Sequence, residues 1–473
     1  MCGVKNSSLF SPAMNRRLSL FVLLFAVSCT TVISTGFTPD DKPRNVVFFI
    51  SDGCGPASFG LAREFQREKD GIPKLDIDRY NRGSVITFAD SSRVTDSAAS
   101  ATAYACGIKT YNGAIGMNSY RESVETVLEK AEKAGYNTGL ISTARLTHAT
   151  PAAFSSHVIA RAMEHEIAVQ QLEQGIEILM GGGHAFFSSP EVGGNRPDSL
   201  DLIQRAIDKG YHNVTNRSEM MAADELPMIA LFTPGMMAYE IDRDQETEPS
   251  IAEMTVKSLE LLAASDKPFF IMIEAGRIDH AGHANDPGAH IHDVLAYDEA
   301  WQAAVDFARS DGETLVVGTS DHETGGLTLG AEIYGMRGTG YQYDPRGYTN
   351  ASSSISHYTM SLPWENGKRV LPGVGELATD MIELFGANGD SAVKEAYEWG
   401  EIKYSRGDSV AFPQLHWAIS RAASASARVG WSTTGHTAVN VPLFAFGPGS
   451  EAFAGVMDNT EIGRAVQAAM GLK

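Results

Sequence analysis

Apolar runs of strand length alternate with amphipathic stretches of helix length along most of the chain. The predicted strands are residues 45–50, 138–141, 268–273, 314–318 and 441–446. The predicted helices, with apolar residues at helical spacing, are 124–134, 251–264 and 294–308. Strands that alternate with helices in this way are typical of a parallel sheet covered by helices on both faces, so the sequence predicts an α/β fold.

The alternation stops between about residues 330 and 431. This segment is rich in Gly, Tyr and Ser from 334 to 354, and it contains one clear helical pattern at 376–385 and a polar helical stretch near 392–399. We interpret it as an insertion over one edge of the sheet. The sequence therefore predicts one large domain, residues 40–473, with an insertion at about 330–431.

The first residues carry a targeting pattern. Arg16 and Arg17 precede an apolar run, 18–27, that is too short for a membrane-spanning helix but suits the core of a signal peptide. We therefore predict a signal segment within residues 1–36, no transmembrane span, and export to the periplasm or the medium. Small residues before Cys29 resemble a lipobox, so a membrane-anchored lipoprotein, lipidated at Cys29, is the alternative to soluble export.

Composition limits the classes of binding partner and indicates whether the cysteines form a disulfide. The 473 residues carry a net charge of -20, which argues against nucleic acid or an anionic membrane surface as a specific partner. If the substrate is an anion, the positive field must be local, which favours bound metal ions or a placed arginine. Beyond the signal segment only Cys54 and Cys106 remain, and two buried thiols are favoured over a disulfide bridge.

Acidic or imidazole side chains follow three of the predicted strands. Asp52 follows the first, Glu274 follows the run at 268–273, and Asp321 with His322 follows the run at 314–318. One such carboxylate is usually a helix cap or a turn residue. Three strands that end in this way indicate a shared site, because ligands of open α/β sheets bind at the carboxyl ends of the strands.

A second group has the composition of a metal site. Asp279 and His283 are four residues apart, so a helix or a turn lets both converge on one ion, and this ligand pair suits zinc. His436, just before the last strand, supplies another imidazole. Each of these alone is more often an ordinary surface charge or loop histidine.

Ser97 stands before a run of small residues, as at the beginning of a helix. Backbone N–H groups and the helix dipole favour an anion there, and the hydroxyl can act as a nucleophile if a metal lowers its pKa. The alternative is that Asp96 or Ser97 merely caps the helix. The absence of a G-x-S-x-G elbow argues against an α/β-hydrolase esterase.

Taken in order, these motifs resemble those of the alkaline phosphatases, in both their bacterial and animal branches. The resemblance spans about residues 45–449, and its matching segments are 49–53, 95–98, 104–109, 147–152, Arg161, 180–183, 274–280, 321–323 and 435–437. It implies a three-layer αβα sandwich with a large, mostly parallel central sheet and an inserted, crown-like segment. It also implies hydrolysis of phosphate monoesters through a phosphoserine on Ser97, and a homodimer.

The resemblance further implies two zinc ions and one magnesium ion. The implied ligands are Asp279, His283 and His436 for the first zinc, Asp52, Asp321 and His322 for the second, and Asp52, Thr150 and Glu274 for magnesium. Arg161 stands where the family has the arginine that grips the phosphate. Asp96, His148 and His280 are expected beside the site.

Some positions depart from the family pattern. His148 and His280 stand where some bacterial members have Asp and Lys, so the chain follows the animal-type pair there. The magnesium site is affected most, because His148 could tune it or admit another ion. Cys54 stands where methionine is common, and it has no evident chemical role.

The residues argue against three rival functions. A sulfatase needs a C/S-x-P-x-R context, which Ser97 lacks. A phosphodiesterase on the same scaffold typically lacks the third metal site and the arginine, so Glu274 with Arg161 favours monoesters. A secreted phosphate-binding protein without turnover would not need Ser97 beside two zinc sites.

Overall fold

The computed structural model of the chain describes residues 42–331, 341–365, 368–369, 374–386 and 411–472. The predicted signal segment and the polar helical stretch near 392–399 lie outside these residues. No helix among the described residues is both long enough and apolar enough to cross a membrane.

A ten-stranded sheet forms the centre of the structure, in the order β16-β2-β15-β8-β1-β7-β3-β4-β6-β5. Its strands are β1 (Asn45–Ile50), β2 (Asn81–Ile86), β3 (Asn137–Arg145), β4 (Ile178–Gly182), β5 (His212–Val214), β6 (Met228–Leu231), β7 (Phe269–Glu274), β8 (Thr314–Thr319), β15 (Val441–Phe446) and β16 (Gly455–Asp458). Strand β15 is antiparallel to its neighbours β2 and β8, and the other paired strands of this sheet are parallel. This confirms the predicted α/β fold with a large, mostly parallel sheet.

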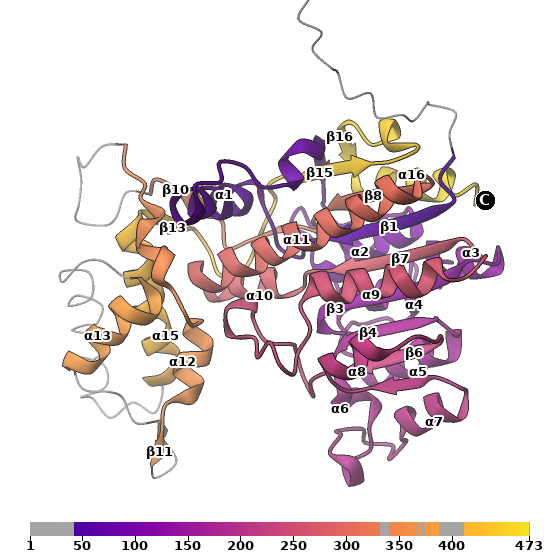
Figure 1. The fold of residues 1–473 in the computed structure, drawn as a ribbon, viewed down its shortest axis with the longest axis horizontal. Coiled ribbons are helices and arrows are strands. Elements are labelled where there is room, and N and C mark those ends of the chain that lie inside the picture. Colours follow the sequence, from indigo (N-terminus) through magenta and orange to yellow (C-terminus); the bar gives the residue numbers. More distant parts are fainter. Residues whose placement is uncertain (1–41, 332–340, 366–367, 370–373, 387–410, 473) are drawn as a thin grey trace, which may run out of the picture. The chain divides into compact units, whose positions relative to one another are not determined.

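Helices cover both faces of the sheet, because strands such as β1 are apolar on both sides. Phe48 belongs to an apolar cluster with residues of α2 (Ser97–Cys106), α4 (Ala149–Ser155) and α16 (Asn459–Ala469). Phe49 points to the other side and packs with residues of α9 (Ile251–Ala263) and α11 (Pro287–Asp311). Figure 1 shows α9 and α11 side by side over one face. Continuous apolar runs are expected of strands buried on both faces.

Two helices begin at other residues than the apolar pattern predicted, and their caps explain why. Helix α3 (Val127–Lys133) begins after residue 124, because the Thr126 hydroxyl accepts a hydrogen bond from the Glu129 N–H and the Glu129 carboxylate accepts one from the Thr126 N–H. Helix α11 begins seven residues before the predicted position 294, because Asp286 caps it and Pro287 is its first residue.

The inserted segment builds its own apolar cluster. Its described elements include α12 (Ile355–Ser361), α13 (Val374–Phe385), α15 (Ala411–Ala427) and β13 (Val429–Trp431), and β13 pairs with β10 (Leu327–Leu329), which precedes the insertion. The cluster also takes in residues of α1 (Pro56–Asp70) and Ile291 of α11. From α15, His416 lies 2.9 Å from the carbonyl of Ala284, and the Ser420 hydroxyl donates to the carbonyl of Asn285 over 2.7 Å. The insertion therefore contacts the helix that carries Asp279 and His283, while the limits 40–473 and 330–431 stay predictions.

Both remaining cysteines are free and buried, as the sequence favoured. Cys54 follows Asp52 and Gly53 in the loop after β1, and Cys106 ends α2. Burial raises the pKa of Cys54 well above its usual value and that of Cys106 to about 12. Both thiols are therefore uncharged at physiological pH, and neither is a thiolate nucleophile.

Candidate active site

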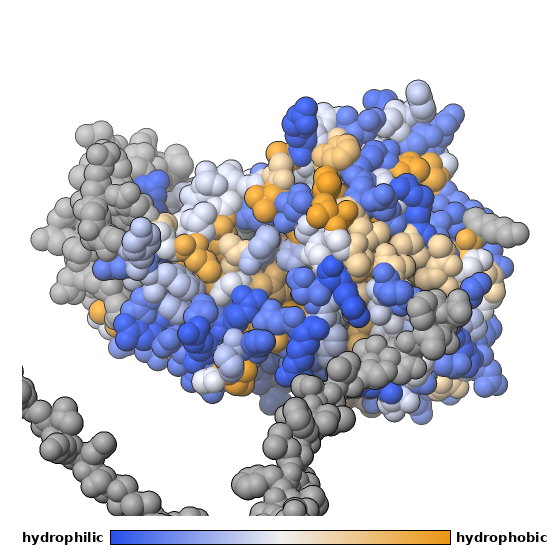
Figure 2. Space-filling view, turned by 90° about the horizontal axis from the view of Figure 1, so that it is seen from above, coloured by the Kyte–Doolittle hydropathy of each residue, from blue (hydrophilic) through white to orange (hydrophobic). Residues whose placement is uncertain are grey.

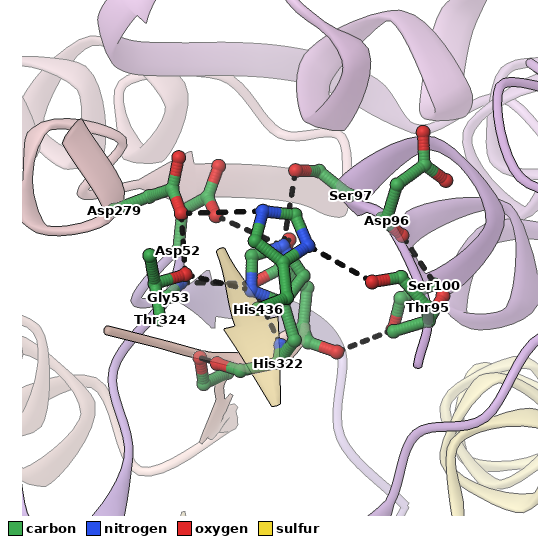
Figure 3. Close-up of polar contacts among 12 residues, drawn as sticks. Asp52, Gly53, Thr95, Asp96, Ser97, Ser100, Asp279, His322, Thr324 and His436 are labelled. Carbon is green, nitrogen blue, oxygen red and sulfur yellow. Dashed lines mark hydrogen bonds and ion pairs between the residues drawn. The ribbon is translucent and has the colours of Figure 1, made fainter. Parts of the chain in front are cut away.

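Helix α2 presents Ser97 at its first turn. The Asp96 side chain caps the helix by accepting a hydrogen bond from the Ala99 N–H over 3.0 Å. Ser97 is buried, and its Oγ lies 3.2 Å from Nε2 of His322. In Figure 3 this hydroxyl points toward the stacked rings of His322 and His436, whose centroids are 3.5 Å apart. The helix cap was the alternative to a nucleophile, and the structure assigns the cap to Asp96, which leaves the Ser97 hydroxyl facing the histidines.

A first cluster joins Asp279 and His283 of α10 (Arg277–Ala284) to His436 of β14 (His436–Thr437). Nε2 of His436 lies 3.2 Å from Nε2 of His283 and 3.6 Å from a carboxylate oxygen of Asp279. Nδ1 of His283 contacts the carbonyl of Thr434, and Nδ1 of His436 contacts the carbonyl of Thr95. Each ring therefore holds its proton at Nδ1 and turns Nε2, the ligand-type nitrogen, into the cluster.

A second cluster consists of Asp52, Asp321 and His322. Nε2 of His322 lies 3.1 Å from Oδ2 of Asp321 and 3.6 Å from Oδ1 of Asp52. Oδ1 of Asp321 accepts hydrogen bonds from the N–H groups of Gly53 and His322, whereas Oδ2 of Asp321 and both oxygens of Asp52 are buried and accept none. Buried carboxylate oxygens without donors are costly, and a bound cation satisfies them.

A glycine lets the two clusters approach each other. Gly53 has φ +72°, and a Cβ at this position would lie only 2.7 Å from Cα of Asp279. No other residue fits such a backbone contact. Thr324 adds a direct link, because its hydroxyl donates to Oδ1 of Asp279 over 2.6 Å. The loop after β1 is therefore held directly against α10.

A third group lies behind the second cluster. Ligand-type atoms of Asp52, Glu274 and His148 are within 4.8 Å of one another. Oε1 of Glu274 and Oγ1 of Thr150 are buried and have no hydrogen-bond partner in the structure, while the other Glu274 oxygen accepts from the Ser142 hydroxyl. Carboxylate oxygens of Asp52 and Glu274 thus lie together there, and oxygen is the ligand type that Mg²⁺ prefers.

Arg161 lies beside this group and is held at both ends of its guanidinium. Nη1 donates to Oδ2 of Asp96 over 3.1 Å, and Nη2 lies 2.9 Å from Nε2 of His148. Nε2 of His148 thus accepts from Arg161, while Nδ1 of the same ring is buried without a hydrogen-bond partner. His280 contacts the carbonyl of Gly276, and its ring centroid lies 5.6 Å from that of His148.

Charge in the site is unbalanced without cations. Burial, and next the charge of Asp321, raises the pKa of Asp52 well above its usual value, and burial raises the pKa of Glu274 to about 7. Burial acts in the same sense on Asp279, but His322 and His283 outweigh it and lower its pKa. Burial lowers the pKa of His436 to about 4. Burial acts in the same sense on His322, but Asp321 outweighs it and raises its pKa, so without cations a charged imidazole compensates the crowded carboxylates. Imidazole nitrogens and carboxylates together are ligands that divalent cations bind.

The structure brings the predicted site residues together at the carboxyl ends of the central strands β1, β7 and β8, and it adds residues that the sequence did not single out. Thr324 and Ser142 position Asp279 and Glu274, respectively. Both are short polar residues with no local spacing that distinguishes them from turn residues. Their role is visible only once the strands are adjacent.

Comparison with known proteins identifies the family. The family model for alkaline phosphatase matches residues 43–472. The chain belongs to the alkaline phosphatase family. It is 35% identical over 442 residues to an alkaline phosphatase of Schizosaccharomyces pombe, covering 90% of this chain and 81% of the relative. It is 33% identical to alkaline phosphatase 4 of Bacillus subtilis, covering 88% and 87%.

Solved structures of the family have the same fold. The crystal structure of Thermus thermophilus alkaline phosphatase is 29% identical, with a TM-score of 0.78 and coverage of 95% of this chain and 96% of that one. The cold-active enzyme of a Shewanella species is 28% identical, with a TM-score of 0.77 and coverage of 90% and 99%. The chain is therefore a metal-dependent hydrolase of phosphate monoesters, and the diester alternative has less support than the monoester one.

Proposed function

We propose that the chain hydrolyses phosphate monoesters through a phosphoserine on Ser97, assisted by two zinc ions and one magnesium ion. The observation that carries the proposal is the buried Ser97 hydroxyl, 3.2 Å from His322 and directed toward two clusters of ligand-type side chains. The proposed ligands are Asp279, His283 and His436 for one zinc, Asp52, Asp321 and His322 for the other, and Asp52, Thr150 and Glu274 for magnesium. The buried, unpaired oxygens of Asp52, Glu274 and Asp321 fit these ions.

The residues suggest a double displacement. When bound, the metal ions lower the pKa of a nearby hydroxyl or water and stabilise negative charge on phosphoryl and leaving oxygens. Ser97 Oγ attacks phosphorus and loses its proton, the bond from phosphorus to the ester oxygen breaks, and that oxygen gains a proton as the alcohol departs. Water then attacks the phosphoserine, the bond to Ser97 breaks, and the Ser97 oxygen regains a proton as inorganic phosphate leaves. N–H groups at the start of α2 and the guanidinium of Arg161 face the equatorial oxygens throughout.

The third site is proposed to hold magnesium rather than zinc. Asp52, Thr150 and Glu274 offer only oxygen atoms, and His148 is engaged by Arg161. Among similar structures are variants of the enzyme from the Antarctic bacterium TAB5 in which a histidine is replaced by Glu or Asp and magnesium is bound in a site called M3, at 26% identity and TM-scores of 0.65 and 0.64. These structures support a magnesium site in the family.

Elemental analysis of the purified protein, together with rates on a nitrophenyl phosphate monoester and its diester, tests the proposed function. We expect two zinc ions and one magnesium ion per chain and a monoester rate far above the diester rate. Turnover of the monoester by a protein that contains neither metal, or a faster diester reaction, would contradict the proposal.

Arg161→Ala is expected to lower kcat/KM for the monoester by about 10- to 100-fold, the effect of losing charged hydrogen bonds worth about 1.5–3 kcal/mol. The inhibition constant of inorganic phosphate should rise by a similar factor, because phosphate would bind through the same guanidinium N–H groups as the substrate. Arg161→Lys should not restore the wild-type values, since an ammonium cannot make two parallel hydrogen bonds. Steady-state kinetics with phosphate inhibition measures both, and an unchanged inhibition constant would exclude Arg161 as a phosphate ligand.

A homodimer is proposed from the exposed edge of the sheet. Figure 2 shows apolar residues gathered in a band across the face seen from above in Figure 1, with hydrophilic residues on both sides. At the β16 edge, Ile86, Phe88 and Val456 are 37%, 44% and 66% exposed. Exposed apolar side chains next to an edge strand favour contact with a second copy. Light scattering after size exclusion should give about twice the monomer mass, and Val456→Glu should lower it; an unchanged dimer would place the interface elsewhere.

Export is proposed from the signal segment within residues 1–36, with soluble periplasmic or secreted protein favoured over a lipoprotein. The mass of the mature protein distinguishes them. Cleavage between residues 28 and 38 without added lipid supports soluble export, whereas a diacylated Cys29 identifies an anchor.

A further inference from the structure

The segment just after α2 connects the two loops that carry the proposed nucleophile and the proposed phosphate ligand. Residues 91–96 lead into Ser97, and residues 156–163 carry Arg161. Neither loop belongs to the central sheet. Something else must therefore set the distance between the hydroxyl and the guanidinium.

On one side, the carboxamide of Asn112 binds the backbone of the nucleophile loop. Its Oδ1 accepts from the N–H of Asp96 over 3.1 Å, and its Nδ2 donates to the carbonyl of Val94 over 3.1 Å. The backbone N–H of Asn112 also donates to the Ser91 hydroxyl over 3.0 Å. A primary amide offers a donor and an acceptor side by side, as a neighbouring strand would. Asn112 thus supplies the pairing that this loop lacks.

On the other side, the residues next to Asn112 bind the arginine loop. The N–H of Arg161 donates to the carbonyl of Gly113 over 2.8 Å, and the Tyr111 hydroxyl donates to the carbonyl of Ile159 over 3.0 Å. Gly113 has φ +91°, a conformation that favours glycine, so the chain can turn between its two sets of contacts. Residues 111–113 therefore contact both loops within three positions.

The side chains of Asp96 and Arg161 link the two loops directly. Asp96 caps α2 through Oδ1 and receives Arg161 Nη1 at Oδ2, so the residue whose N–H binds Asn112 also holds the guanidinium. In Figure 3 the Asp96 carboxylate points away from His322 and His436, and its Oδ2 accepts the hydrogen bond from Arg161. A shift of Asp96 would move both the beginning of the nucleophile helix and the position of the arginine.

We propose that Asn112 is a positioning residue, which aligns Ser97 with Arg161. It does so by fixing residues 94–96 of the nucleophile loop against residues 111–113, which in turn bind the arginine loop. The inference rests on the proposed function, in which these two side chains act on one phosphoryl group. Asn112 is exposed and needs no contact with substrate for this role. Because alignment errors of about 1 Å can cost on the order of 100-fold in rate, the effect should appear in catalysis more than in stability.

Asn118 offers a matched control in the same part of the chain. Its Oδ1 accepts from the N–H groups of Tyr120 and Glu122, and its Nδ2 donates to the Glu122 carboxylate. Its side chain therefore makes three hydrogen bonds, one more than that of Asn112, but none of them reaches the nucleophile or arginine loop. A purely structural role predicts similar behaviour of the two alanine variants.

The test compares Asn112→Ala and Asn118→Ala as metal-loaded proteins. Asn112→Ala should lower kcat/KM for a nitrophenyl phosphate by about 10- to 100-fold and weaken inhibition by inorganic phosphate. Its zinc content and melting temperature should equal those of the Asn118→Ala control. Asn118→Ala should keep wild-type kinetics. Equal kinetics of the two variants, or a loss in Asn112→Ala that follows its zinc content, would overturn the proposal.

Asn112→Asp covers the case in which the alanine variant does not fold. It keeps the shape and the acceptor toward Asp96, but it places a carboxylate oxygen against the carbonyl of Val94, so a fall in kcat/KM is again expected. Wild-type kinetics in Asn112→Asp would overturn the proposal. Failure of the proposed function itself has a different signature, because full turnover in Ser97→Ala would remove the phosphoserine without reference to Asn112.

Discussion

Replacing Ser97 with alanine is expected to lower kcat for a phosphate monoester by about 10⁴- to 10⁶-fold, because the reaction loses its nucleophile and not merely a binding contact. Residual turnover would come from the metal ions and Arg161 acting on water directly. Zinc content and melting temperature should stay near those of the wild type, since Asp96, not Ser97, caps α2. Steady-state kinetics, metal analysis and thermal unfolding of the same preparation measure all three.

Ser155→Ala is the matched control for this variant. Ser155 is buried, ends α4, and its hydroxyl donates to the carbonyl of Pro151 rather than facing the ligand clusters. Its removal should leave kcat within about twofold, as for a polar side chain outside the chemistry. A Ser97→Ala enzyme as active as Ser155→Ala, with its metals bound, would exclude the covalent route.

His436→Ala is expected to remove the first zinc and to lower kcat/KM by at least about 100-fold. The cluster would keep Asp279 and His283, but these two ligands leave a zinc site half open, so the ion should dissociate. Titration with zinc followed by dialysis and elemental analysis should give one zinc fewer than in the wild type. Activity should return in part at high zinc concentration, by mass action.

His212→Ala controls for the loss of a histidine as such. His212 lies at the start of β5 with its side chain 49% exposed, and it contacts Glu225 over 3.1 Å. It should retain the full zinc content and wild-type kinetics. If His436→Ala also retained two zinc ions, the assignment of Asp279, His283 and His436 to one ion would be wrong.

The fold and the strand-end residues could be predicted from local patterns. Strand β1 appeared as a continuous apolar run with Asp52 directly behind it, and β8 appeared in the same way with Asp321 and His322. Each signal lies within about ten residues, where period and polarity are visible. Helix beginnings were less accessible, because the Thr126 and Asp286 caps decide them by hydrogen bonds that the apolar pattern does not contain.

The convergence of distant segments could not be derived from spacing alone. His283 and His436 are 153 positions apart, and only their approach to 3.2 Å makes them one cluster. The same holds for Gly53, whose absent side chain admits Asp279, and for Asn112, whose partners belong to a loop that precedes α2. The resemblance to a family supplied the first of these groupings, whereas the role of Asn112 depends on the arrangement of the loops.

In the proposed reaction the hydroxyl of Ser97 receives the phosphoryl group. Rapid acid quenching of the metal-loaded enzyme during turnover, followed by peptide mass spectrometry, tests it most directly. We expect one phosphate on the peptide that contains Ser97, and none on the corresponding peptide of Ser97→Ala. Phosphate on a different residue would contradict it, as would an unmodified Ser97 peptide during full turnover under conditions that preserve phosphoserine.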